Sequence, residues 1–350
     1  MTDIWANIAL ILISIPVLAA GVALLLWTSP RALKGWGLGV IGIEILLVLL
    51  ASPSLSHIEG GLTLLMVATA FLAILTQPSR KEERAVFMLT PVFVGLGLGA
   101  VAGSGIRQLL CVGGILALIS GMILRHGPPP RAQEWGAISL YGLNLLGLST
   151  SFWVAGPTGT SLALVAIAIL LPVAPLHGPF IMTIERAPGT LPAVLAVFLP
   201  CLGFAEFSAI SSDLPMPALR ILSWVALLTA LYAALRALVQ ISMERVLTYA
   251  FLAQCGILWW YIARASTSAI QAASYLSALS LVTAGLLLAA TQLRVRFGHL
   301  DLDKLGGLAL PMPRFAVFVT LLITAAIGLP FFPLFSGFLG LLLNKEVILS

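Results

Sequence analysis

Charged residues are scarce in this chain, at 9% of its 350 residues, whereas an ordinary soluble domain carries roughly 25%. Hydrophobic residues make up 60% of the sequence, and the mean hydropathy is +1.10. So few charges cannot cover the surface of a soluble fold of this size. The composition therefore predicts an integral membrane protein that resides in a lipid bilayer.

Cysteine is also rare: Cys111, Cys201 and Cys255 lie far apart in apolar tracts, which excludes a disulfide framework and a metal site. No glycine-rich phosphate loop and no nucleophile paired with a base is present. No basic run interleaved with aromatic residues indicates nucleic-acid binding. We therefore expect no catalytic residues, no metal, no cofactor, no nucleic-acid partner and no catalysis by the chain on its own.

Long apolar runs are abundant, and each is close to the roughly 20 residues that a helix needs to cross the hydrocarbon. Twelve such runs lie near residues 5–27, 35–51, 60–76, 85–103, 108–124, 136–155, 160–182, 191–210, 219–241, 246–263, 269–293 and 315–343. They lack the alternation of a barrel strand. The first lacks the basic leader and cleavage site of a signal peptide, so we expect it to be helix one of the mature chain. The predicted fold is all-α, with about 12 transmembrane helices.

Lysine and arginine predict the orientation, because they collect in cytoplasmic loops. Of the 18 such residues, most fall in the loops after helices 1, 3, 5, 7, 9 and 11. They are Arg31, Lys34, Arg80, Lys81, Arg84, Arg125, Arg131, Arg186, Arg245, Arg294, Arg296, Lys304 and Arg314. Both termini should then face outward across a bacterial-type inner membrane.

Two of the apolar runs are interrupted by proline. Residues 170–180 read "LLPVAPLHGPF", with Pro172, Pro175 and Pro179, and residues 328–340 read "GLPFFPLFSGFLG", with Pro330 and Pro333. The interrupted helices are the seventh and the twelfth, so they cross the membrane in opposite directions. That arrangement is typical of inverted-repeat transporters with broken helices, although a proline in a membrane helix can also mean bending alone.

Three stretches resemble one known family. Residues 171–196, "LPVAPLHGPFIMTIERAPGTLPAVLA", resemble the helix seven to eight segment of the antiporter-like subunits of respiratory complex I, membrane hydrogenases and Mrp antiporters. Residues 237–258, "ALVQISMERVLTYAFLAQCGIL", are similar to the family's helix nine to ten hairpin. Residues 301–319, "DLDKLGGLALPMPRFAVFV", resemble its long cytoplasmic connection.

The resemblance implies a proton or sodium path of buried lysine, glutamate and histidine. Carried over to this chain, those family positions fall on residues that are apolar or do not titrate, namely Leu170, Pro200 or Cys201, Gly114 or Ile115, Leu279, Phe338 and Gln254. We interpret the chain as a member that kept the fold and lost the pumping residues, so that the break in helix seven is an architectural feature.

The resemblance also implies a division of the chain. Residues 1–84 would hold helices one to three, residues 85–210 a first five-helix repeat, and residues 211–350 a second repeat. The family's second repeat runs to helix thirteen, whereas this sequence ends at "LLLNKEVILS", so we expect the second repeat to be incomplete. An uncovered helix interface is usually filled by a partner. We therefore expect other membrane and soluble subunits as partners.

Four polar residues in apolar runs are candidate functional residues: Glu44, His177, Glu206 and Arg236. Glu44 falls near the bilayer centre and should face protein, either neutral or bonded to a partner subunit, paired with Arg236, or acting as a proton relay. Glu206 is four residues from a helix end and can reach the interface. His177 follows Pro175, where it can bond carbonyls freed by the break or donate protons.

Two functions remain open from the sequence. The first is a scaffold subunit of a complex I-like energy-converting assembly, of the NADH:quinone oxidoreductase or hydrogenase type, which as a whole is a translocase. The second is the membrane component of an ion-coupled transporter, such as an inorganic-carbon uptake complex. An autonomous channel is a third, weaker possibility.

Overall fold

The computed structural model describes residues 2–26, 29–52, 55–80, 83–126, 131–154, 156–211, 214, 216–264, 269–298, 300–304, 306–307, 309–335 and 339. These residues form helices and contain no strand. Helices of the first half are α1 (Thr2–Leu25), α2 (Pro30–Ala51), α3 (His57–Thr76), α4 (Arg84–Val101), α5 (Ile106–Arg125), α6 (Ala132–Trp153) and α7 (Pro157–Leu170). Those of the second half are α8 (Gly178–Arg186), α9 (Leu191–Ile210), α10 (Met216–Leu238), α11 (Met243–Arg264), α12 (Ala269–Phe297) and α13 (Pro313–Ile327).

The helices confirm the predicted all-α membrane fold. Eight of those described are long and apolar enough to cross a membrane, and three shorter ones are also apolar. The protein is therefore a multi-pass integral membrane protein. The predicted seventh helix is present as two pieces, α7 and α8, separated at residues 171–177. The predicted twelfth begins as α13 and is interrupted after Ile327, where Gly328 adopts a left-handed conformation with φ of 75°. Pro330 and Pro333 follow this interruption, and Phe338 lies outside the described residues.

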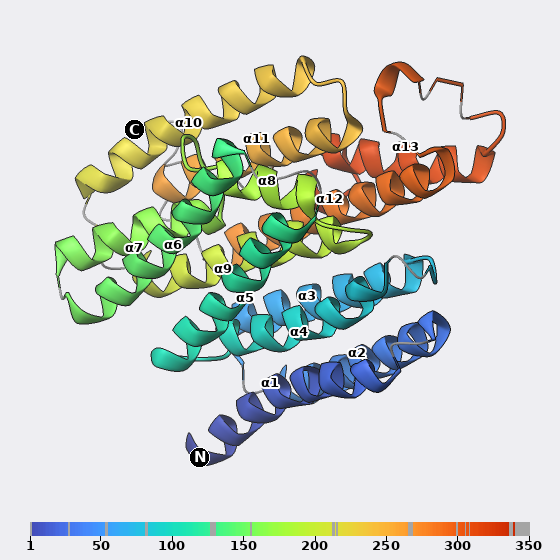
Figure 1. The fold of residues 1–350 in the computed structure, drawn as a ribbon. Coiled ribbons are helices and arrows are strands. Elements are labelled where there is room, and N and C mark those ends of the chain that lie inside the picture. The colour runs from blue at the N-terminus through green and yellow to red at the C-terminus, as the bar shows by residue number, and fades with distance from the viewer. Residues whose placement is uncertain are drawn as a thin grey trace.

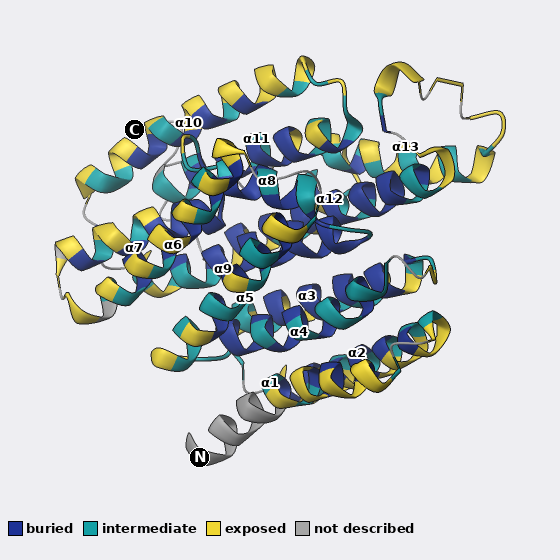
Figure 2. Cartoon of the chain, in the orientation of Figure 1, coloured by how far each residue is buried: buried dark blue, intermediate teal, exposed yellow. Residues whose placement is uncertain are grey.

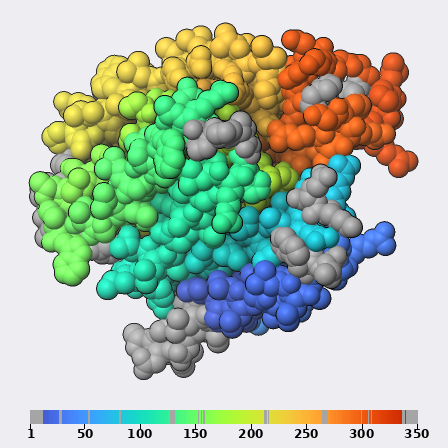
Figure 3. Space-filling view, in the orientation of Figure 1, coloured from blue at the N-terminus to red at the C-terminus, as the bar shows by residue number. Residues whose placement is uncertain are grey.

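The helices lie side by side in one bundle, with α1 and α2 along one edge, α3 and α4 next, and α10 on the opposite edge (Figure 1). The space-filling view shows the same order, from the blue N-terminal edge to the yellow and orange helices across the molecule (Figure 3). Helix α9 occupies the centre, where it packs against α3, α4, α7, α8 and α12.

Burial follows the hydrophobic pattern of each helix. Helix α9 is apolar on all sides and is buried almost continuously from Leu191 to Phe204, as expected of a helix surrounded by other helices. Helix α10 is also apolar but exposes a leucine-rich face that includes Leu228, Leu231 and Leu235, which suits contact with lipid. Figure 2 shows this contrast, with α9 mostly dark blue and α10 largely yellow.

Close approach between α10 and α11 depends on a missing side chain. A Cβ atom added at Gly256 of α11 would lie 2.7 Å from the backbone nitrogen of Ala230 and 2.8 Å from the backbone oxygen of Ala226 on α10. Small residues let membrane helices approach in this way. Because the clashing atoms are backbone, a larger residue must push the two helices apart.

We expect Gly256→Ala to lower the free energy of unfolding by about 1–3 kcal/mol, the usual cost of overpacking. Gly142→Ala in α6 is the matched control, because a Cβ atom there meets nothing within 4 Å, and alanine is the better helix former. Thermal unfolding of the purified chain in detergent measures both. Equal midpoints for the two variants would contradict the close α10–α11 contact.

Candidate functional site

The break between α7 and α8 is the main polar feature inside the bundle. Helix α7 ends at Leu170, and the next helix begins only at Gly178. Pro172 and Pro175 lie within the gap, and Pro179 lies in the first turn of α8. Proline cannot donate a backbone hydrogen bond and disfavours helix at the residue before it, which explains why the helix stops here. Backbone groups of the gap therefore need partners from other helices.

Two neighbouring helices supply such partners. The indole Nε1 of Trp259 on α11 donates to the carbonyl oxygen of Leu171 at 3.1 Å. The backbone nitrogen of Ala174 donates to Oγ1 of Thr229 on α10 at 3.0 Å. Next to the gap, in α7, the carbonyl oxygen of Ala166 accepts from Nδ2 of Asn144 on α6 at 2.6 Å. The break is thus bonded from α10 and α11, and the end of α7 from α6, by side chains that do not titrate.

His177 shows no bond from Nδ1 to the carbonyls freed by the break within the described residues, so the structural role expected of it stays a prediction. It occupies the N-cap position of α8, and its buried Nδ1 has no hydrogen-bond partner among the described residues. Its ring meets the edge of Tyr232 with centroids 5.4 Å apart. Trp259 and Thr229 bond backbone groups of the break, and the histidine faces a cavity.

That cavity has a volume of about 660 Å³ and is bounded by α6, α8, α10 and α11. His177, Arg236, Arg245, Glu185 and Tyr249 are among the residues that line it. Two of the four candidate residues from the sequence therefore meet in one place. The guanidinium of Arg236 lies 5.7 Å from the centre of the Tyr249 ring, a cation–π contact.

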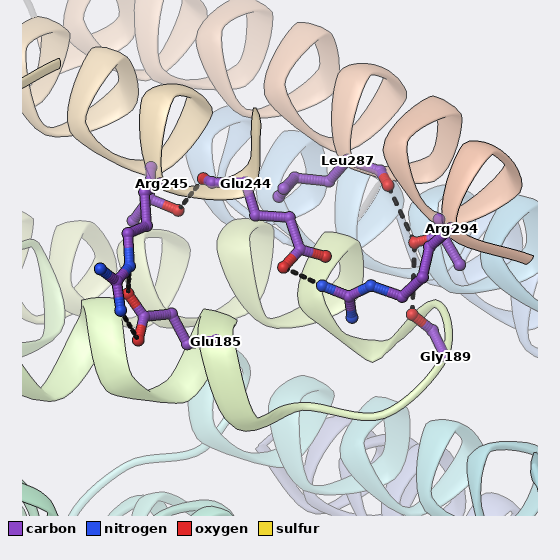
Figure 4. Close-up of polar contacts among 8 residues, drawn as sticks. Glu185, Gly189, Glu244, Arg245, Leu287 and Arg294 are labelled. Carbon is purple, nitrogen blue, oxygen red and sulfur yellow. Dashed lines mark hydrogen bonds and ion pairs between the residues drawn. The ribbon is translucent and has the colours of Figure 1, made fainter. Parts of the chain in front are cut away.

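Glu185 binds Arg245 at the rim of the cavity, with Nε 2.7 Å from Oε1 and Nη2 3.3 Å from Oε2 (Figure 4). This pair joins α8 to α11. The adjacent Glu244 pairs with Arg294 and joins α11 to α12. A third pair, between Arg186 and Glu134 at 2.5 Å, joins α8 to α6.

The loop after α8 is held to α12 beside these pairs. The hydroxyl of Thr291 lies 2.9 Å from the carbonyl oxygen of Leu287 and 3.3 Å from that of Gly189 (Figure 4). Acids and bases thus meet as matched pairs at one end of the bundle, where the helices end. The second half of the broken helix is fixed to its neighbouring helices by charge.

Glu44 faces protein, as expected. It is 0% exposed in the middle of α2, and neither of its carboxyl oxygens has a hydrogen-bond partner among the described residues. The expected alternative of a pair with Arg236 is wrong, because α2 packs against α1, α3 and α4, whereas Arg236 lies on α10 against Tyr249.

Glu206 lies near the end of α9, where Oε1 accepts a hydrogen bond from Nε2 of Gln108 on α5 at 2.8 Å. The four candidate residues therefore occupy three separate places in the bundle: Glu44 in α2, Glu206 beside α5, and His177 with Arg236 in the cavity. Within the described ranges, no three histidine, cysteine or acidic side chains are grouped so that they could hold a metal ion.

Four of the positions that the family resemblance assigns to proton carriage lie in packed core. Leu170 and Cys201 are 0% exposed, Leu279 is 3% exposed, and Pro200 is buried. Gln254 of α11 accepts a hydrogen bond from the Tyr275 hydroxyl at 2.5 Å. The side chains at these positions thus pack against neighbours.

Sequence reasoning missed the residues that bond the break. Trp259, Thr229 and Asn144 were not singled out, although each puts a hydrogen-bonding group into an otherwise apolar run. That pattern is a usable signal, because a buried polar side chain in a membrane helix needs a partner. The sequence does not say which backbone group the partner is.

Comparison with known proteins assigns the family. Residues 142–347 match the family described as NADH:quinone oxidoreductase/Mrp antiporter, transmembrane region. The chain belongs to this family. It is 27% identical over 227 residues to formate hydrogenlyase subunit 3 of Escherichia coli (strain K12), a match that covers 59% of this chain and 36% of that protein. The matched part therefore spans about a third of that relative.

Solved structures of the NADH:quinone oxidoreductase/Mrp antiporter type share the fold. A chain of the Mrp complex from Dietzia sp. DQ12-45-1b superposes with a TM-score of 0.83 at 18% identity, covering 99% of this chain and 75% of that one. A chain of respiratory complex I from Thermus thermophilus gives 0.77 at 20% identity, covering 96% and 85%. The archaeal membrane-bound sulfane sulfur reductase gives 0.80 at 16% identity, covering 96% and 81%.

We expect Trp259→Phe to lower the free energy of unfolding by about 1–3 kcal/mol, because the buried carbonyl of Leu171 loses its donor. Trp224→Phe makes the same chemical change on the exposed face of α10, where Trp224 is 59% exposed, and should have little effect. Thermal unfolding in detergent compares the two. A Trp259 variant as stable as the Trp224 variant would show that the break does not need this bond.

Proposed function

We propose that this chain is a structural membrane subunit of a multi-subunit, energy-converting complex of the complex I or membrane hydrogenase kind, and that it does not carry protons itself. The observation that carries the proposal is the apolar packing at Leu170, Cys201 and Leu279, which are at most 3% exposed. These are the positions where the resemblance places the family's titratable residues.

A proton path needs titratable groups or waters at hydrogen-bond spacing across roughly 30 Å of hydrocarbon. At the break, the bonded side chains are an indole, a hydroxyl and an amide, none of which exchanges a proton at neutral pH. Around it, α9 is apolar and buried along most of its length. This packing supports a role in holding the membrane part of a complex together.

Two observations support the proposal that this chain belongs to a larger assembly. They are its structural relatives and the apolar side chains exposed on its surface. The structural matches are chains of the Mrp complex, of respiratory complex I and of an archaeal respiratory membrane complex. Helices α2 and α10, at opposite edges of the bundle, expose apolar side chains such as Leu46, Leu50, Leu228 and Leu231. Lipid or other membrane subunits can cover these faces.

The proposal predicts that the purified chain in liposomes shows no proton or sodium flux above that of empty vesicles, because the core around the break is packed with apolar side chains. A pH-sensitive dye inside the vesicles reports the proton flux, and a sodium-sensitive dye reports the sodium flux. An added ionophore verifies that the vesicles are sealed. A robust flux that His177→Ala or Glu206→Gln abolishes would overturn the proposal.

We also propose that both termini face outward and that the loop between α12 and α13 is cytoplasmic. That loop carries Lys304, which bonds Asp301 at 2.8 Å and, as an exposed lysine, is charged at neutral pH. Positive charge retained in a loop favours the cytoplasmic side.

Cysteine labelling in intact cells tests this orientation. We expect Asp303→Cys to react with an impermeant thiol reagent only after the membrane is opened. Ser211→Cys, exposed at the other end of the bundle, should react in intact cells. Native Cys111, Cys201 and Cys255 are buried and provide a low background. Labelling of the Asp303 variant but not of the Ser211 variant in intact cells would invert the topology.

A further inference from the structure

Helices α3 and α12 end, and α13 begins, at one end of the bundle (Figure 1). A second cavity lies there. Its volume is about 760 Å³. Arg80 after α3, Arg296 in the last turn of α12 and Arg314 in the first turn of α13 line it. The remaining lining is Gln292 and apolar side chains, and no acidic residue is among the described residues that line it. The cavity therefore combines three guanidinium groups with apolar walls.

The three arginines are available to a ligand. All three are exposed, and none forms an ion pair within the part of the chain that the structure describes. Nη1 of Arg296 lies 2.9 Å from the neutral sulfur of Met312. By contrast, Arg186, Arg245 and Arg294 at this end of the bundle each have a carboxylate partner. Unpaired guanidinium groups that converge on one cavity favour an anion, and phosphate oxygens match their geometry best.

The wall of the cavity is fixed in place rather than left to loops. Nε2 of Gln292 on α12 donates to the carbonyl oxygen of Thr76 at the end of α3 at 2.7 Å. This bond joins the helix that carries Arg296 to the helix that precedes Arg80. Arg314 is the second residue of α13, which packs against α12. The three cations are therefore positioned by helices that contact one another.

An apolar stripe continues from the cavity along α13. Val317, Phe318 and Leu321 are 62%, 56% and 53% exposed. They follow Arg314 at spacings of three, four and seven residues, so they share its face of the helix. A ligand whose phosphate meets Arg314 can lay apolar chains along this stripe. A free phosphate or an acidic protein segment would not use it.

We propose that this cavity binds the phosphate headgroup of an anionic phospholipid, with Arg80, Arg296 and Arg314 as its ligands and the outer face of α13 as the site for its acyl chains. Basic pockets between membrane helices bind anionic headgroups elsewhere. The bound lipid would join α3, α12 and α13 at the end of the bundle.

Lipid titration of the purified full chain tests the proposal. Micelles are doped with palmitoyl-oleoyl phosphatidylglycerol or with the zwitterionic phosphatidylcholine, and native mass spectrometry counts retained lipid. The wild-type chain should retain phosphatidylglycerol preferentially. The triple variant Arg80→Gln, Arg296→Gln, Arg314→Gln should bind phosphatidylglycerol at least about tenfold more weakly, because each cation contributes to binding an anionic headgroup.

A matched control removes three other exposed cations of the chain. Arg31→Gln, Arg131→Gln and Lys304→Gln lie outside the cavity and should leave the affinity for phosphatidylglycerol within about twofold of wild type, because a site-specific headgroup contact does not depend on distant charge. If the cavity triple variant does not fold, the single variants Arg80→Gln and Arg314→Gln carry the comparison, each with an intermediate loss. Equal loss in the cavity and control variants would mean that only net charge matters, and the site would be refuted.

Two further experiments distinguish lipid binding from the binding of a free anion or of another subunit. Inorganic phosphate at millimolar concentration should displace little phosphatidylglycerol; displacement at equal concentration would identify a free-anion site and overturn the proposal. In native membranes the cavity triple variant should still co-purify with the other subunits. Loss of those subunits with phosphatidylglycerol retention unchanged would make the cavity a protein interface and the lipid proposal wrong.

Discussion

Hydrogen bonding of the broken helix is the constraint on which the rest of the bundle depends. Without water, an unpaired backbone group costs several kcal/mol inside a bilayer, so the gap between α7 and α8 can exist only where other helices reach it. Trp259 of α11 and Thr229 of α10 do so, and Asn144 of α6 bonds the carbonyl of Ala166 just before the gap. These contacts fix where α6, α10 and α11 stand around the break, and the ion pairs Glu185–Arg245 and Glu134–Arg186 hold α8 in the same position from its other end.

Close packing at the centre of the bundle, next to the break, depends on a glycine. A Cβ atom on Gly203 of α9 would lie 2.7 Å from the backbone nitrogen of Leu171, so only glycine lets the two segments touch here. The same added atom would lie 3.1 Å from the Cβ atom of Leu170. The close approach of α9 therefore places the end of α7 and the start of the break in apolar, tightly packed surroundings.

Local elements could be predicted from the sequence because the bilayer sets the length of each apolar run and clustered prolines interrupt a helix, whereas the single prolines Pro16, Pro91 and Pro200 lie inside α1, α4 and α9. The run at 191–210 coincides with α9, and the prolines of residues 172–179 lie at the gap. Contacts between distant helices could not be predicted in this way. Glu44 and Arg236 have compatible depths, yet α2 and α10 lie at opposite edges of the bundle (Figure 1). His177 and Arg236 do share a cavity, but hydropathy says nothing of which faces meet.

A break in a membrane helix is usually explained by a charged group that binds at the break. In this chain, the hydrogen bonds that stabilise the break are separate from the charged side chains. The bonds from Trp259 and Thr229 each run between a backbone group and a neutral side chain, so the stability of the interruption does not depend on ionisation. Charge is instead concentrated where helices end, in matched pairs beside the cavity that holds His177 and in the three arginines around α13. The hydrogen bonds that stabilise the interruption are therefore separate from the charged side chains, which lie beside it in one cavity and at the ends of the helices.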